Sequence, residues 1–106
     1  MDNLSLDCRD GILTVTLKNE IDHHSAVSVR NRIDDALYKE MPRVLVFELS
    51  EVKFMDSSGL GLVLGRYAKA KELGTEVAVK NPSPRTEKIF RMAGTDKFIK
   101  IIHDKE

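Results

Sequence analysis

The chain has 106 residues, of which 42% are hydrophobic and 32% are charged, so it is long enough to bury one core and we expect one domain over residues 1–106. Basic and acidic residues balance at 17 each, which argues against a nucleic-acid-binding protein with a basic surface. No apolar run approaches the ~20 residues of a membrane-spanning helix, and the first residues lack the pattern of a signal peptide. We therefore expect a cytoplasmic protein without direct nucleic-acid or membrane contact.

The first segment predicts a β-hairpin. Residues 4–8 alternate apolar and polar side chains, Asp10 and Gly11 favour a turn, and residues 12–17 alternate again. A period of two on both sides of a short turn is typical of antiparallel strands.

Residues 19–25 are polar and predict a break in regular structure. From Ala26 onward the apolar residues recur at helical spacing, which predicts a helix that ends before Pro42. Asp34 falls on the outward, polar side of this predicted helix.

The second half predicts alternating strands and helices. Residues 44–49 form an almost continuous apolar run, which is typical of a central parallel strand, and residues 51–55 then lead toward a helix with apolar positions from residue 60 onward. Residues 76–80 predict a strand, and Ser83 with Pro84 predicts the start of a further helix. Residues 98–102 fit either an edge strand or a short helix. Strands alternating with helices indicate an α/β fold with a mixed, mostly parallel sheet flanked by helices.

The segment FMDSSGL at residues 54–60 carries the strongest functional signal. Asp56, Ser57 and Ser58 are residue types that cap a helix start, and the N-terminus of a helix favours anions. A phosphate on Ser57 would therefore be tolerated there. The structural alternative is an ordinary cap followed by a close-packed helix.

Three glycines, Gly59, Gly61 and Gly65, lie in the first turns of this predicted helix. Each costs up to about 1 kcal/mol relative to alanine. Their presence predicts either close packing of the helix on the sheet or close approach of a partner's backbone.

Enzymatic alternatives find little support in the sequence. Asp22-His23-His24 is similar to a signature of metal-dependent phosphoesterases, but that chemistry needs several more ligands around two metal ions, and the chain has three histidines in all. Ser57 lacks the Gly-x-Ser-x-Gly elbow of serine hydrolases, and the Gly59-Leu60-Gly61 segment lacks the remainder of a nucleotide-binding loop. We expect no catalytic residue, no metal and no cofactor.

Three segments together resemble the anti-sigma factor antagonists of the STAS domain family, and the sporulation type in particular, which releases sigma factor F. They are NEIDHH at residues 19–24, FMDSSGLG at residues 54–61 and LGRY at residues 64–67. The resemblance covers nearly the whole chain. One departure is Asn19, because that family usually has glycine before Glu20.

The resemblance implies a partner switch in which Ser57 accepts a phosphate from an anti-sigma factor serine kinase that binds ATP. The unphosphorylated chain would bind this kinase and release the sigma factor, the phosphorylated chain would dissociate, and a serine phosphatase would reset it. Further residues are then expected around the phosphosite and on the docking surface: Asp22, His23, Asp56, Ser58, Gly59, Leu60 and Gly61.

Two non-enzymatic alternatives remain open from the sequence. STAS-like domains also serve as scaffold or adaptor modules that are not phosphorylated. The second alternative is a general stress-response antagonist with a different kinase partner.

Overall fold

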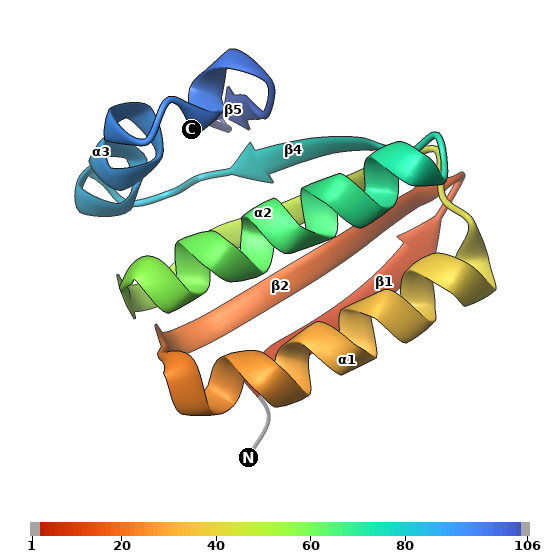
Figure 1. Cartoon of the computed structure of the whole chain (residues 1–106), viewed down its shortest axis with the longest axis horizontal. Coiled ribbons are helices and arrows are strands. Elements are labelled where there is room, and N and C mark those ends of the chain that lie inside the picture. Colours follow the sequence, from red (N-terminus) through yellow and green to blue (C-terminus); the bar gives the residue numbers. More distant parts are fainter. Residues whose placement is uncertain (1–2, 105–106) are drawn as a thin grey trace.

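A computed structural model describes residues 3–104 of the chain, and within them the backbone forms one mixed β-sheet (Figure 1). The strands follow their sequence order across the sheet, β1 beside β2 and so on to β5. Only the β1–β2 pair is antiparallel among these strands, and the other pairs are parallel. The predicted mixed, mostly parallel sheet is thereby confirmed. The strands are β1 (Leu4–Arg9), β2 (Ile12–Ile21), β3 (Val44–Met55), β4 (Glu76–Lys80) and β5 (Lys100–Ile102).

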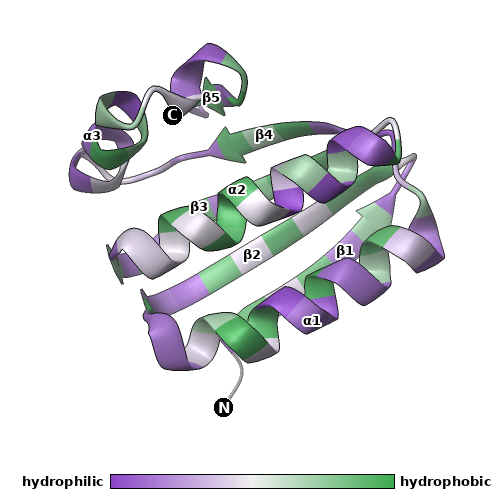
Figure 2. Cartoon of the chain, in the orientation of Figure 1, coloured by the Kyte–Doolittle hydropathy of each residue, from purple (hydrophilic) through white to green (hydrophobic). Residues whose placement is uncertain are grey.

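Two long helices, α1 (His23–Glu40) and α2 (Ser57–Glu72), lie side by side across one face of the sheet, as Figure 1 shows. The shorter α3 (Pro84–Met92) lies beyond the end of β4, and a 3₁₀ turn, η1 (Thr95–Lys97), leads into β5. Figure 2 shows hydrophobic and hydrophilic residues alternating along α1, the pattern of a helix with one buried side. None of the helices within residues 3–104 has the length and apolar character needed to cross a bilayer.

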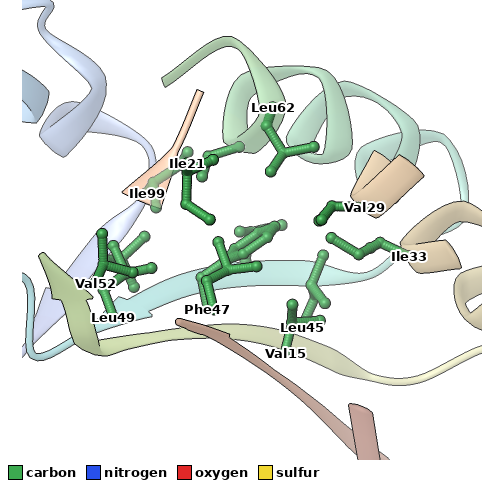
Figure 3. Packing of buried hydrophobic residues seen from close by; sticks show 14 of the residues in the cluster. Val15, Ile21, Val29, Ile33, Leu45, Phe47, Leu49, Val52, Leu62 and Ile99 are labelled. Atoms are coloured by element: carbon green, nitrogen blue, oxygen red, sulfur yellow. The ribbon is translucent and has the colours of Figure 1, made fainter. Parts of the chain in front are cut away.

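The core lies between the sheet and these two helices (Figure 3). Phe47 of β3 is completely buried at its centre, with Val15 of β2 beneath it. Ile33 from α1 and Leu62 from α2 close the core from above. Burial of such a side chain contributes about 1.5–3 kcal/mol, so this layer fixes both helices on the sheet and thereby fixes where they begin.

The polar break predicted for residues 19–25 is wrong, because it is too long. β2 continues to Ile21, which is fully buried and pairs with Met55 of β3, and α1 begins at His23 instead of Ala26. Residues 51–55 likewise extend β3 instead of leading away from it. The reason is mutual pairing, because each extension supplies the backbone partner of the other.

Asn19 occupies an unusual backbone conformation within β2. Its φ angle is 66°, in the left-handed region, and the pairing register with β3 shifts between Asn19 and Glu20. Asparagine tolerates this region better than other residues with a Cβ atom. Glycine, which the resemblance above leads one to expect at this position, also adopts the left-handed region readily.

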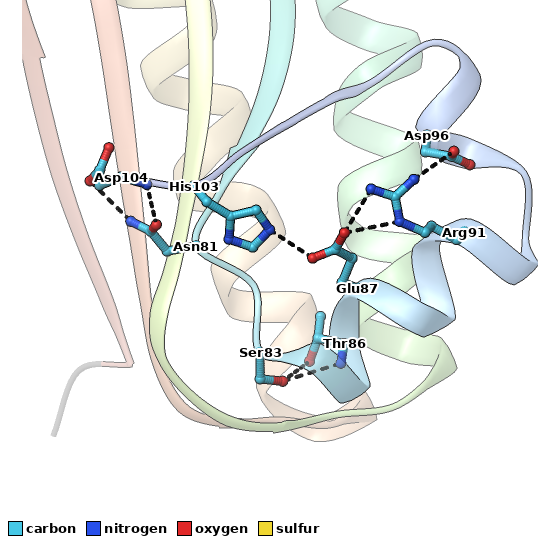
Figure 4. A network of polar contacts seen from close by, with 8 residues as sticks. All are labelled: Asn81, Ser83, Thr86, Glu87, Arg91, Asp96, His103 and Asp104. Atoms are coloured by element: carbon cyan, nitrogen blue, oxygen red, sulfur yellow. Dashed lines mark hydrogen bonds and ion pairs between the residues drawn. The ribbon is translucent and has the colours of Figure 1, made fainter. Parts of the chain in front are cut away.

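Of the two structures that the sequence left open for residues 98–102, the edge strand is the one present, as β5, and η1 lies just before this segment. Polar side chains fasten it to α3 and to the end of β4, as Figure 4 shows. His103 Nε2 lies 2.7 Å from Glu87 Oε1, and the Asp104 backbone N–H donates to Asn81 Oδ1 over 2.9 Å. Glu87 also accepts from Arg91 Nη2 at 2.7 Å.

Candidate functional site

The candidate site lies where β2 and β3 end together. Ile21 and Met55 are paired across the two parallel strands, and the residues that follow them, Asp22 and Asp56, are the N-caps of α1 and α2. Neighbouring strands are about 4.8 Å apart, so two capping carboxylates and two helix N-termini meet at one edge of the sheet. Ser57, the first residue of α2, lies at this edge.

Asp22 caps α1 through a reciprocal pair of bonds with Ser25. Its Oδ1 accepts from the Ser25 backbone N–H at 3.0 Å, and its own N–H donates to Ser25 Oγ at 3.2 Å. The bond from the Ser25 backbone, followed by smaller hydrogen-bond contributions, lowers the pKa of the Asp22 carboxyl. Asp22 is therefore a fixed negative charge at neutral pH, although its side chain is exposed.

Asp56 caps α2 without such a reciprocal pair. Its Oδ1 accepts from the Ser58 backbone N–H at 2.8 Å, and its carbonyl oxygen accepts from Gly59 at 3.0 Å. The carboxylate is partly buried. The free N–H groups at this helix start, expected from the sequence to favour an anion, are thus partly satisfied by Asp56 itself.

Ser57 and Ser58 differ in environment although they are adjacent. Ser57 is exposed, and within residues 3–104 its hydroxyl has no hydrogen-bond partner. Ser58 is half-buried and lines a groove between α1 and α2. Of the two hydroxyl groups, that of Ser57 is therefore the more accessible to solvent.

The glycines expected near Ser57 have separate roles. Gly59 is buried, and a Cβ atom there would collide with the Met55 side chain, whose Sδ would lie 2.9 Å away. A Cβ atom added at Gly61 or at Gly65 would have no neighbouring atom within 4 Å. The close packing suggested by the sequence thus holds for Gly59, whereas Gly61 and Gly65 leave open space, and the approach of a partner's backbone stays a prediction. Leu60 packs against the core while remaining partly exposed.

The groove between the two helices has a volume of about 300 Å³. Its lining includes residues from both helices: His23, Arg30, Ser58, Gly61, Gly65 and Arg66. His23 and Gly61, expected around the phosphosite, both lie here. Arg30 and Arg66 were not predicted as site residues, because no motif marks them and only the placement of α1 against α2 brings them together.

A buried ion pair lies beneath the groove. Arg66 Nε is 2.7 Å from Asp34 Oδ1, and both side chains are largely shielded from solvent. The outward position predicted for Asp34 is therefore wrong, because α2 covers that side of α1. Burial lowers the pKa of the Arg66 guanidinium, and Asp34 opposes that effect.

Residues 3–104 contain no group of three histidine, cysteine, aspartate or glutamate side chains placed to hold a metal ion. Asp22 belongs to the α1 cap, and His23 and His24 are exposed in the first turn of that helix. Asp22, His23 and His24 thus form the start of α1.

Comparison with known proteins gives consistent matches. A model of the STAS domain matches residues 3–106. The chain is 36% identical over 98 residues to the anti-sigma F factor antagonist of Paenibacillus polymyxa, an alignment covering 92% of this chain and 84% of that protein.

Two solved structures are similar over most of the chain, and both share 28% sequence identity with it. The anti-sigma factor antagonist SpoIIAA in its unphosphorylated form has a TM-score of 0.84, with coverage of 97% of this chain and 89% of that one. The Bacillus cell fate determinant SpoIIAA in its phosphorylated form has a TM-score of 0.79, with coverage of 97% and 92%.

Proposed function

This chain belongs to the STAS domain family, and from that premise we propose that it is an anti-sigma factor antagonist of the sporulation type. The unphosphorylated chain binds an anti-sigma factor that is also a serine kinase, and this binding releases the sigma factor. The kinase holds ATP and transfers a phosphate to Ser57, and a serine phosphatase removes it. Catalysis belongs to the partners, and this chain serves as ligand and substrate in the cytoplasm.

The observation that carries this proposal is the exposed Ser57 hydroxyl beside two capping carboxylates. Ser57 follows Asp56 directly, and Asp22 caps the neighbouring helix at the same edge of the sheet. A phosphoserine would add about −1.5 to −2 charges at neutral pH. A surface that two carboxylates already make negative would then become strongly anionic.

Charge accumulation at this edge is sufficient to switch binding off without refolding. Burying the phosphoserine against a partner would require desolvation or close approach of like charges. A penalty of about 4 kcal/mol corresponds to a roughly thousandfold loss of affinity. The likeness of the chain to SpoIIAA in both its unphosphorylated and phosphorylated forms supports a change of surface instead of a change of fold.

The docking surface in this proposal surrounds Ser57. Asp22 and Asp56 supply charge, His23 and Ser58 flank the groove, and Gly61 leaves room for a partner's backbone. Leu60 adds an apolar contact from its exposed part. Gly59 contributes indirectly by letting α2 start close to Met55.

Mass spectrometry tests the phosphoacceptor. The chain is incubated with ATP and the sporulation-type anti-sigma factor kinase, with Ser57→Ala and Ser58→Ala as matched variants. We expect one phosphate on the natural chain and on Ser58→Ala, and none on Ser57→Ala. A phosphate that persists in Ser57→Ala, or no phosphate on the natural chain, overturns the proposal.

A further inference from the structure

The groove between α1 and α2 holds a buried cation whose hydrogen-bonding capacity is largely unused. Arg66 is only 6% exposed, yet its Nε makes no hydrogen bond of acceptable geometry within residues 3–104. The same holds for Asp34 Oδ1, although the two atoms lie 2.7 Å apart as an ion pair. A guanidinium carries five donors, and the ion pair with Asp34 engages the one on Nε, so the donors on the two terminal nitrogens are left for another acceptor.

A second cation lies at the same groove. Arg30 lines it from α1 and is exposed, and the positive charge of Arg30 acts against that of Arg66. Arg66 is paired with Asp34, and Arg30 adds a second guanidinium at the groove, so the two cations outnumber the one carboxylate paired there. Ser58 adds a hydroxyl at the end of the groove nearest the phosphosite.

The α2 wall of this groove lacks side chains at two points. Gly61 and Gly65 both line it, and an added Cβ at either would meet no atom within 4 Å. These glycines lower the intrinsic stability of the helix and have no internal packing reason. They leave a path along which another main chain can approach the two arginines.

We propose that this groove receives a carboxylate side chain of the docked anti-sigma factor kinase, held by Arg66 and Arg30. The inference rests on the proposed function and extends it to a second contact point beside Ser57. Arg–carboxylate contacts are among the stronger charge-assisted bonds. A kinase surface that fits this chain therefore carries an acidic residue opposite the groove.

Calorimetric titration of the kinase tests the groove contact. Ser57→Ala is used as the parent chain, so that no phosphate is transferred during the measurement. Arg30→Gln removes one groove cation, and Lys71→Gln removes an exposed cation from the last turn of α2 as a matched control. We expect about tenfold weaker binding for Arg30→Gln and less than about twofold for Lys71→Gln. Equal affinities in the two variants overturn the proposal.

Steric blocking provides an independent variant. Gly65→Leu places a helix-compatible side chain in the groove, away from the core. We expect an undiminished melting temperature and at least about tenfold weaker kinase binding. A folded Gly65→Leu variant with the parent affinity contradicts the proposal.

Acetate serves as a probe of the isolated chain. In NMR spectra, acetate is expected to shift the Arg66 Nε–Hε signal and the Gly61 amide more than chloride does at equal ionic strength. Identical shifts in both salts contradict a carboxylate site, and acetate binding without any effect of Arg30→Gln on the kinase contradicts the proposed occupant.

Phosphorylation of Ser57 and binding at the groove are measured separately, so each can fail without the other. If the natural chain accepts a phosphate on Ser57 while Arg30→Gln binds as the control does, only the groove contact is wrong. If the natural chain accepts no phosphate on Ser57, the proposed function itself is wrong.

Discussion

At the scale of single residues, the same carboxylates serve structure and charge. The Asp56 carboxylate accepts a hydrogen bond from the Ser58 backbone N–H at 2.8 Å, and the Asp22 carboxylate accepts one from the Ser25 backbone N–H at 3.0 Å. Each group starts a helix and also makes the edge around Ser57 negative. Substitutions that keep the acceptor oxygen but remove the charge separate the two roles.

Asp56→Ala is expected to lower the free energy of unfolding by about 1 kcal/mol, because the cap of α2 is lost. Asp56→Asn keeps an acceptor and is expected to cost less than about 0.5 kcal/mol. Urea denaturation followed by circular dichroism measures both. Equal losses would show that charge, and not the capping bond, accounts for the contribution of Asp56.

Ser57→Asp is expected to weaken kinase binding by roughly tenfold, since one added negative charge imposes part of the penalty of a phosphate. Ser57→Asn has nearly the same shape without charge and serves as the matched control, with affinity near that of the natural chain. Calorimetry compares the two. A Ser57→Asp variant that binds as tightly as Ser57→Asn would contradict the electrostatic explanation.

At the scale of elements, the start of α2 was predictable and the start of α1 was not. Asp56, Ser57 and Ser58 form a recognisable cap before a helical pattern, and Ser83 with Pro84 likewise marks the start of α3, as the structure confirms. The equivalent signal at α1 is the Asp22 to Ser25 capping box after buried Ile21. It was obscured by the polar residues of β2, whose extension depends on pairing with β3.

Alanine substitution is expected to change the stability of the fold in opposite directions at two glycines of α2. Gly59→Ala is expected to destabilise the fold by about 1–3 kcal/mol, because the new Cβ collides with Met55 in a packed layer. Gly61→Ala is expected to stabilise it by up to about 1 kcal/mol, because its Cβ meets no neighbour and alanine favours the helix. Chemical denaturation distinguishes them, and destabilisation of similar size in both would contradict the assigned roles.

At the scale of the whole molecule, sequence patterns could not predict the contacts between helices and strands. Helical spacing placed Asp34 on an outward side, and only the packing of α2 against α1 turns it toward Arg66. The groove with Arg30 and Arg66 depends on the same packing. By contrast, the alternation of strands and helices was sufficient for the fold class, since each strand and helix carries its own periodicity.

The polar contacts around Glu87 predict how stability changes with acid. The bond from Arg91, followed by that from His103, lowers the pKa of Glu87 below its ordinary value of 4.5. Because the folded-state pKa is the lower one, this contribution is present above about pH 4.5 and is lost as the pH falls through the folded value. Glu87→Gln is therefore expected to lose less stability than the natural chain between about pH 6 and pH 3.

Denaturation at several pH values measures this difference, with the exposed Glu76→Gln as a control for a change in net charge. Parallel stability curves for the natural chain and Glu87→Gln would show that Glu87 contributes nothing to the attachment of the C-terminal segment.

In the proposed switch, a phosphate at Ser57 turns a docking surface into a repellent one. Calorimetric titration of the anti-sigma factor kinase with one preparation of the chain, before and after complete phosphorylation of Ser57, tests this most directly. We predict an affinity loss of about a thousandfold with an unchanged circular dichroism spectrum. Equal affinities, or a loss of affinity accompanied by unfolding, would contradict it.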